Sequence, residues 1–589
     1  MIRLCRLVFI LLMSAAVPCL AQGLGKVTVK GVAGELKENV EKSLSLMRVP
    51  EEERAAVSQA RLDYLLKAAP SEIDRALQPY GHYQSSVQSK VSRKNGAANV
   101  TLTIEPGEPV QVMRTSAVVQ GDASEDEKVS QALSGIGPRE GEPLDHRRYE
   151  AGKLAVQRVL LERGYFDAQL ETHRVAVRRA AQQAEIDLSW TSGPRYRFGT
   201  TRFAGSHIRD SLLEKTIPYE QGEPYEQAEL LDLHQRLTQL DYFGYIDVRP
   251  EPSAAQDGEV PIEISLIPGK RTVYTAGLSY GTDSGPGVQL GVERRWVNDR
   301  GHKLAANLDW AQRRRSLGVE YRIPAFAWAE GWYVFGANRR EEDSDTVETR
   351  ITELVASRTG VWRGWNLSVA VHTRQEEFRI GGGVLRGGSE GDSFLLYPAL
   401  SASYVDSDHA MYPTRGYSVR GEVKFGAQAL LSDVDFVQAL LDAKLIRSLG
   451  PNNRFLFRGQ LGRTVTDEFS ALPPSLRFFA GGDRSIRGYG YQEVGPRETN
   501  ALGTHVPTGG KNLLTGSAEY ERMFTPSWGA AAFVDAGNAF NEVNEGAYVG
   551  AGLGVRWRSP VGMVRFDLAH GFKDADNSIQ IHINIGPDL

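Results

Sequence analysis

The sequence predicts three α+β repeats of the β-α-α-β-β type, followed by a 16-stranded antiparallel transmembrane β-barrel. Two observations carry this prediction. The first half of the chain repeats strand and helix periods with matching turns. From Arg271 onward the apolar residues recur at every second position for more than 300 residues, and helical periods nearly vanish. The expected domains are a signal peptide (1–21), the repeats (22–107, 108–193 and 194–269) and the barrel (270–589).

The opening of the chain has the pattern of a secretory signal peptide. A positively charged start precedes an apolar stretch over residues 7–16, and small residues lead to an expected cleavage after Ala21. The apolar stretch is far shorter than the roughly 20 residues of a spanning helix. Lipidation at Cys19 is the weaker alternative, because Pro18 is a poor neighbour for it. Cys5 and Cys19 are the only cysteines, so the mature chain would have no thiol chemistry.

Composition excludes several classes of protein. A net charge of −5 argues against a dedicated nucleic-acid binder. The 11 histidines show no metal-ligand spacing, and no catalytic constellation is recognisable. We therefore expect neither an enzyme nor a metal or other cofactor.

The repeats are defined by matching turns and helices. A Gly-Glu-Pro turn at 141–143 and at 222–224 introduces an amphipathic helix, expected over 148–163 and 227–239. A glycine next to an aromatic residue follows each helix: Gly81, Gly164 and Gly244. We expect this glycine to supply a left-handed cap and the aromatic residue to enter the core. Each repeat leaves one sheet edge open, which is typical of docking platforms that accept an extended strand.

The barrel prediction is clearest at the end of the chain. Isoleucines at every second position from Ile579 to Ile585 alternate with polar residues. About sixteen such segments, each near the ten residues of a tilted spanning strand, fit after Arg271. In the strand 549–557, the face opposite the apolar one carries Gly550, Gly552, Gly554 and Arg556. A lumen wall made of glycine leaves room for something inside the barrel.

A long loop at 477–491 is the candidate for that occupant, because it is rich in glycine, arginine and aromatic residues. Alternation places Glu519 and Asp535 on the lumen side of neighbouring strands. A guanidinium can fork onto a carboxylate, so we predict that Arg487 pins the loop to these two acids, with Gly488 and Tyr489 beside it.

At these residues the chain resembles the BamA/TamA-type insertases, a superfamily of outer-membrane proteins with periplasmic POTRA repeats and a barrel. The matching segments are the Ile-Arg-Gly-Tyr loop (476–489), 533–537, 552–562 and 585–589. In this superfamily the loop arginine meets acidic residues of the inner wall. The chain departs from most outer-membrane barrels because it lacks a terminal Phe or Trp.

The resemblance implies an outer-membrane factor that assembles other outer-membrane proteins, autotransporters among them. It implies three kinds of partner: a TamB-like inner-membrane-anchored protein, unfolded outer-membrane clients and outer-membrane lipid. Glycine in the first barrel strand and a Gly-Pro end after the last strand would weaken the seam between these strands, which could then open laterally. The expected seam residues are Tyr274, Gly277, Ile583, Gly586 and Pro587.

Two alternatives remain open. A two-partner secretion pore would export a dedicated substrate through the lumen. Such transporters usually carry two POTRA repeats and an N-terminal plug helix, whereas this sequence shows three repeats and no plug pattern. A plain porin is a more distant alternative, because porins do not need the soluble half.

Overall fold

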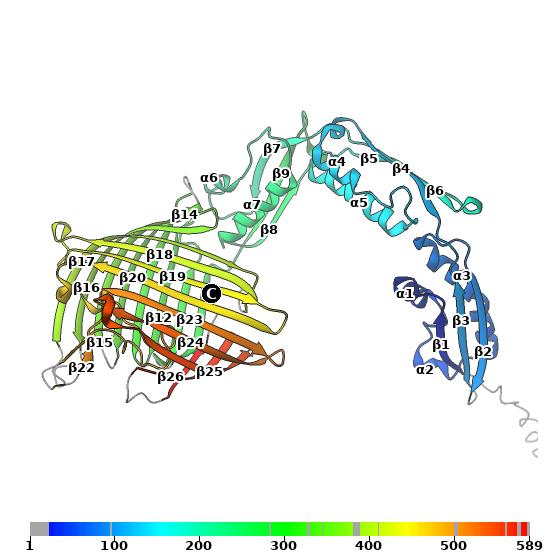
Figure 1. The fold of residues 1–589 in the computed structure, drawn as a ribbon. Coiled ribbons are helices and arrows are strands. Elements are labelled where there is room, and N and C mark those ends of the chain that lie inside the picture. The colour runs from blue at the N-terminus through cyan, green and yellow to red at the C-terminus, as the bar shows by residue number, and fades with distance from the viewer. Residues whose placement is uncertain are drawn as a thin grey trace, which may run out of the picture. The chain divides into compact units, whose positions relative to one another are not determined.

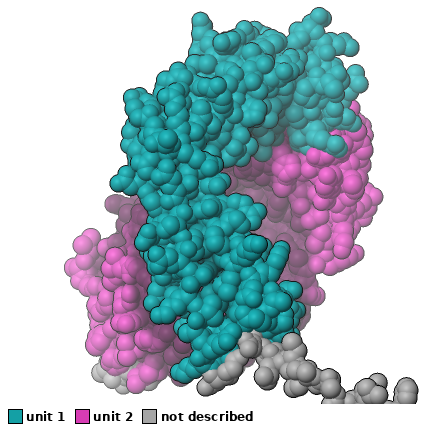
Figure 2. All heavy atoms as spheres, turned by 90° about the vertical axis from the view of Figure 1, so that its right-hand side faces the viewer, with its two compact units in different colours: residues 1–202, 218–232, 248–263 teal, residues 203–217, 233–247, 264–589 magenta. Residues whose placement is uncertain are grey.

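The structure is a computed structural model that describes residues 23–94, 97–281, 284–326, 330–344, 347–380, 389–409, 412–499, 503, 505–559, 562–573 and 579–585. It divides into two compact units, which Figure 2 shows in different colours. The first unit comprises Met1–Arg202, Pro218–Asp232 and Val248–Glu263. The second comprises Phe203–Ile217, Leu233–Asp247 and Ile264–Leu589. The expected signal peptide lies outside the described residues.

Three β-α-α-β-β repeats open the chain, as predicted (Figure 1). The first contains β1 (Leu24–Lys30), α1 (Gly34–Ser43), the short α2 (Glu51–Arg54), α3 (Gln59–Leu77), β2 (Ser86–Lys94) and β3 (Ala97–Glu105). The second contains β4 (Gln111–Gln120), α4 (Glu127–Ser134), α5 (His146–Glu162), β5 (Gln169–Arg178) and β6 (Gln183–Thr191). The third contains β7 (Arg197–Ala204), α6 (Asp210–Leu213), α7 (Gln227–Gln239), β8 (Phe243–Pro250) and β9 (Glu259–Pro268).

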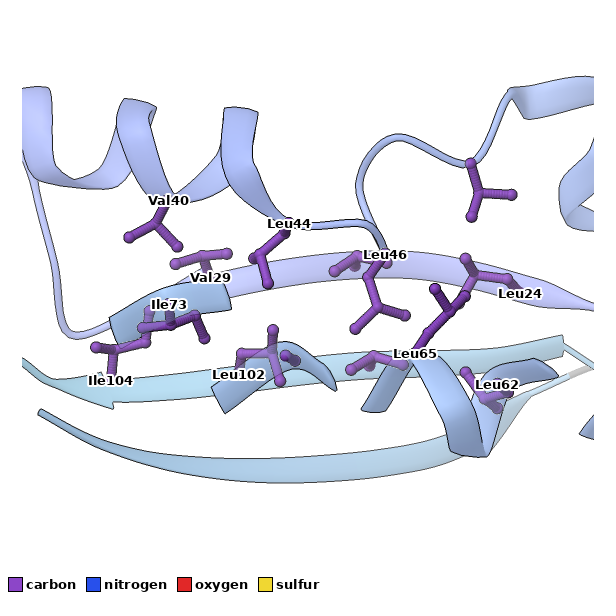
Figure 3. Packing of buried hydrophobic residues seen from close by; sticks show 14 of the residues in the cluster. Leu24, Val29, Val40, Leu44, Leu46, Leu62, Leu65, Ile73, Leu102 and Ile104 are labelled. Atoms are coloured by element: carbon purple, nitrogen blue, oxygen red, sulfur yellow. The ribbon is translucent and has the colours of Figure 1, made fainter. Parts of the chain in front are cut away.

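Each repeat forms a three-stranded sheet whose last strand lies in the middle, in the orders β1-β3-β2, β4-β6-β5 and β7-β9-β8. The helices bury apolar side chains against the sheet. In the first repeat, Figure 3 shows Val40 of α1 and Ile73 of α3 near Leu102 and Ile104 of β3. All four side chains are almost completely buried. Burial of this kind supplies most of the stability of so small a unit.

The predicted glycine caps occur in two of the three repeats. Gly81 and Gly164 both have a φ of 84°, the left-handed conformation expected of such caps. The prediction is wrong for Gly244, which lies inside β8. Here α7 ends at Gln239 and β8 begins at Phe243, so the turn falls earlier in the chain. Asp241 takes the left-handed conformation instead, with a φ of 55°.

Within the second unit, side chains join part of the third repeat to the first barrel hairpins. Of the two aromatic residues beside Gly244, Phe243 is buried as predicted and Tyr245 is 55% exposed; Tyr242 is completely buried. The Tyr242 hydroxyl donates to the carbonyl of Gly301, 2.5 Å away. The Arg209 guanidinium donates to Asp299 at 2.6 Å. These contacts attach the repeat to the turn between the second and third barrel strands.

The second half is a 16-stranded antiparallel sheet, as predicted. Its strands follow the chain in order: β10 (Thr272–Gly281), β11 (Gly285–Arg294), β12 (Lys303–Ala311), β13 (Arg314–Pro324), β14 (Glu330–Asp343), β15 (Val347–Trp362), β16 (Trp365–Ile380), β17 (Ser389–Ser407), β18 (Arg415–Gly426), β19 (Phe436–Ser448), β20 (Asn453–Val465), β23 (Asn512–Met523), β24 (Trp528–Phe540), β25 (Tyr548–Ser559), β26 (Gly562–Gly571) and β27 (Gln580–Ile585).

The sheet has an apolar outer face and a polar inner face. In β25, Leu553 is 68% exposed on the outside, whereas Arg556 of the opposite face is completely buried. This alternation is that of a strand between lipid and lumen. Among the described residues, no helix is long and apolar enough to cross a membrane.

Candidate functional site

The loop between β20 and β23 folds into the barrel lumen. It contains a short hairpin, β21 (Arg497–Thr499) with β22 (His505–Pro507). Its apolar side chains form a buried cluster with two residues of the barrel wall: Phe478, Ala480, Ile486, Tyr489 and Val494 pack with Leu513 and Ala539. The apolar character of this loop thus follows from its packing, as the sequence predicted.

Arg487 lies at the centre of the contacts between the loop and the wall, and its side chain is 3% exposed. Its Nε and Nη2 atoms donate to the two carboxylate oxygens of Asp535 at 2.7 and 3.0 Å. Its backbone N–H donates to the same carboxylate at 3.0 Å. Nη1 donates to Glu519 at 2.7 Å. The structure therefore brings together the arginine and both acids that the sequence singled out.

The wall supplies three further partners for Arg487 that sequence reasoning did not assign, and one of them is Ser517, whose hydroxyl accepts from Nη2 at 3.4 Å. Asp567 of β26 accepts from Nη1 at 2.9 Å. The guanidinium carbon also lies 3.4 Å from the centre of the Phe533 ring, in the range of a cation–π contact. Alternation in β26 puts Asp567 on the inner face, but the face alone does not give the height of a residue along the barrel. Three carboxylates and one ring thus surround a single cation.

The charged network continues from the loop along the wall. Arg556 donates to Asp567 and Glu519, and also to Glu521 at 2.8 Å. Glu521 in turn accepts from Nε of Arg454. Arg454 and Arg556 are each at most 1% exposed. Burying so many charges is costly unless every member is paired, so the network fixes the relative positions of the loop and five neighbouring strands, β20 and β23–β26.

Glycines of β25 make the space for these contacts. A Cβ atom added at Gly550 would lie 1.9 Å from the carbonyl oxygen of Arg487. One added at Gly554 would lie 1.9 Å from an oxygen of Asp567. Both distances are far inside van der Waals contact. At Gly550 the space is occupied by the loop, as predicted, whereas at Gly554 it is occupied by Asp567 of the neighbouring strand.

Gly488 and Tyr489 extend the contacts to the last strands. Gly488 has a φ of 97°, which favours glycine, and its N–H donates to Nε2 of His582 in β27 at 3.2 Å. The Tyr489 hydroxyl donates to the carbonyl of Val549 at 3.1 Å and accepts from the N–H of Lys573 at 3.1 Å.

Two loop contacts reach β27, and we call them the β27 latch. The first is the bond from Gly488 to His582. In the second, Nδ2 of Asn584 donates to the carboxylate of Asp483 at 2.9 Å. The polar face of the last strand is therefore bound to the loop, and the apolar face is left for lipid. Sequence reasoning found no signal for this latch.

The start of the loop and its middle part are held by strands elsewhere in the sheet. Ser475 donates through its hydroxyl and its N–H to Glu376 of β16. Nε2 of Gln438 in β19 donates to the carbonyl of Leu476 at 2.6 Å. The Tyr491 hydroxyl donates to Glu342 of β14 at 3.0 Å. The loop thus joins the inner faces of β14, β16 and β19 to those of β23–β27.

The predicted seam lies between β10 and β27. Within the described residues, the two strands lie beside each other but no hydrogen-bonded ladder joins them. Tyr274 of β10 is 78% exposed on the outer face. Gly277 lies on the inner face opposite Gln289 of β11, and Ile583 is paired with Phe566 of β26.

The strand that forms the second edge of the seam, β27, is short. β27 spans six residues, compared with ten in β10. Gly586 and Pro587, the other predicted seam residues, lie outside the described residues.

Three family models match this architecture. An Omp85 superfamily domain matches residues 297–588. A POTRA domain described as TamA domain 1 matches residues 26–106. A surface antigen variable number repeat, also of the POTRA kind, matches residues 196–269.

Curated relatives agree with these matches. The chain is 23% identical over 428 residues to the outer membrane protein assembly factor BamA of Nitratidesulfovibrio vulgaris, over 69% of this chain and 52% of the relative. It is 21% identical over 436 residues to BamA of Neisseria meningitidis serogroup B, over 62% of this chain and 53% of the relative. The chain thus spans about half the length of the curated relatives it matches.

A solved structure shares the fold. BamA from Haemophilus ducreyi lacking POTRA domains 1–3 aligns with a TM-score of 0.69 and 16% identity, over 81% of this chain and 99% of that one. The fold and the matches together define a barrel of the outer membrane with POTRA repeats in the periplasm. The barrel domain belongs to the Omp85 superfamily, and the chain is similar to the BamA/TamA group of this superfamily in its first repeat and in the curated relatives it matches.

Proposed function

We propose that this protein is a TamA-type assembly factor that inserts other β-barrel proteins, autotransporters among them, into the outer membrane. The TamA-type match of the first repeat and the presence of three repeats support this choice within the superfamily. The proposed activity consists of strand pairing and insertion, and neither requires a covalent step. We therefore propose no enzymatic activity.

One observation carries the proposal: within the described residues, no ladder joins β10 to β27. Backbone N–H and C=O groups of these two edges are costly to leave unpaired in lipid. A client strand that pairs with such an edge would satisfy them, as in β-augmentation. The edge can thus template the first strand of a client.

The lumenal loop contributes to this mechanism because it contacts both the barrel wall and β27. The Arg487 network fixes the loop to the wall, and the β27 latch holds the last strand to the loop. Separation of β27 from β10 would then require the latch to break or the loop to move with β27. The contacts of the loop with the walls also argue against the alternative of a secretion pore, because export through the lumen would require the loop to leave.

Two partners follow from the proposed role. Unfolded outer-membrane proteins are the clients. A TamB-like protein anchored in the inner membrane would reach the POTRA repeats, whose sheets each present an edge strand: β2, β5 and β8. Photo-crosslinking from these three edges would identify the repeat that it contacts.

A cross-link across the seam tests the proposed function. Cysteines at Tyr274 and Ile583 lie on the outer face of the two edge strands and can be joined by a short bismaleimide. We expect the joined protein, reconstituted in vesicles, to insert a urea-denatured barrel client no better than vesicles without protein. Insertion is measured as the heat-modifiable client band.

A second cysteine pair controls for the cross-linker. Gly421 and Leu441 stand opposite each other in the ladder of β18 and β19, where no opening is expected. Joining this pair should leave client insertion unchanged. If the protein joined at the seam inserts clients at the normal rate, lateral opening is wrong.

A further inference from the structure

Two rows of charged side chains cross the outer face of β13–β17. Strand register places Arg315, Glu341, Arg350, Glu377 and Asp392 in the first row. It places Asp343, Glu348, Arg379 and Glu390 in the second. We call these nine residues the charged rows. In β15 the residues of the rows lie on the same face as Leu354, which is 56% exposed on the lipid side. In β14 they lie on the same face as Phe335, which is 51% exposed.

Arginines bridge the strands within each row. Arg350 lies 3.3 Å from Glu341 and 3.1 Å from Glu377, on the two neighbouring strands. Arg379 likewise lies 2.8 Å from both Glu348 and Glu390. All of these side chains are more than a third exposed, so the pairs themselves add little stability. They also line an open cavity of about 670 Å³.

The rows carry more acid than base, with six carboxylates and three arginines. Two pairs of acids stand directly opposite each other: Glu377 faces Asp392, and Asp343 faces Glu348. Like charges in directly opposed positions destabilise a sheet. Arg350 and Arg379 already pair with one acid of each opposed pair, Glu377 and Glu348. A divalent cation would compensate the charge that remains on Asp392 and Asp343.

The rows lie at the level of the lipid headgroups. On the outer face of β15, Arg358 lies near the periplasmic end of the strand, where it packs on Tyr333. Arg350 follows eight positions away along the strand. At about 3.3 Å per residue and a tilt of about 40°, this spans about 20 Å, close to the height of about 25 Å of the apolar band of such barrels. Glu348 of the second row lies ten positions from Arg358, about 25 Å by the same measure, so the charged rows lie at the outer edge of the hydrocarbon.

We propose that the charged rows bind phosphate-bearing glycolipid headgroups of the outer leaflet through divalent cations. The exposed guanidinium groups of Arg350 and Arg379 can donate directly to phosphate oxygens. The opposed carboxylates can share Mg²⁺ or Ca²⁺ with the same phosphates. This proposal concerns the membrane contact of the barrel and stands apart from the proposed assembly function.

The chemistry of the acids fits a shared cation. Among the described residues, no three acidic, histidine or cysteine side chains converge to hold a metal on their own. Mg²⁺ is commonly bound by one or two carboxylates, with phosphates and water completing its shell. A cation at the opposed pairs would therefore need the lipid to complete its site.

Native mass spectrometry of the full chain in detergent tests this proposal, with bisphosphorylated lipid A as the probe. We expect lipid A to bind in the presence of Mg²⁺ and to be largely lost with EDTA. The double variants Arg350→Gln/Arg379→Gln and Glu377→Gln/Asp392→Asn should each bind severalfold less. Dephosphorylated lipid A should bind weakly to every form.

Matched arginines of the second repeat supply the control. Arg114 and Arg174 form exposed ion pairs with Asp187, far from any barrel strand in sequence. The double variant Arg114→Gln/Arg174→Gln loses the same charge and should bind lipid A like the wild type. Heat-modifiability verifies that each barrel is folded. Lipid A binding that resists EDTA, or that is unchanged in both row variants, would overturn the proposal.

Discussion

Arg487→Ala is expected to destabilise the folded barrel by about 3–5 kcal/mol, because it leaves buried carboxylates without their cation. Asp535 is completely buried, and Glu519 and Asp567 are 7% and 4% exposed. The measurement is the temperature at which the heat-modifiable band unfolds on a gel. Arg487→Lys should lie between the alanine variant and the wild type, since an ammonium keeps the charge but loses the planar fork.

The matched control is Arg484→Ala, three residues away in the same loop. Its side chain is exposed, so its removal should change the stability by no more than about 0.5 kcal/mol. Equal unfolding temperatures for the two alanine variants would contradict the role of Arg487 as the pin.

The exchange of Arg487→Asp with Asp535→Arg is not expected to restore stability. It would rescue an isolated pair, but the new carboxylate would face Glu519 and Asp567. Its failure would therefore not argue against the pin.

Gly550→Val is expected to displace the loop from the wall, because its Cβ would overlap the carbonyl oxygen of Arg487. Overpacking of a close contact typically costs about 1–3 kcal/mol. Displacement should expose the loop, so limited proteolysis of the folded barrel should cleave between β20 and β23 much faster than in the wild type.

Gly318→Val provides the comparison. Gly318 lies on the inner face of β13, and a Cβ added there meets nothing within 4 Å. We expect this variant to resist the protease like the wild type. Protection of the loop in Gly550→Val would show that the glycine wall does not determine the position of the loop.

Much of this architecture was predictable because its signals are local and periodic. Alternation over two residues defines a strand and its faces, so the barrel and the inward positions of Asp535 and Glu519 follow from sequence. The loop could be assigned to the lumen because apolar residues such as Ile486 need a packed environment. Arg487, which follows Ile486, was then predicted to pair with Asp535 and Glu519.

The remaining contacts of the site depend on the height of each residue along the barrel and on the path of the loop. Alternation along a strand gives neither. Asp567 meets Arg487 because neighbouring strands are staggered, and Glu376 meets Ser475 because the loop reaches β16. In the sequence, His582 and Asn584 are recognisable only as residues on the polar face of an amphipathic strand. Their contacts with the loop depend on its folded conformation.

The central claim is that the pinned loop holds β27 beside β10. It is tested most directly by the distance between spin labels placed on the outer face of these two strands, measured in vesicles by pulsed electron paramagnetic resonance. The account predicts one narrow distance distribution in the wild type and in Arg484→Ala, and broad distributions in Arg487→Ala and Asn584→Ala. The same narrow distribution in all four proteins would contradict it.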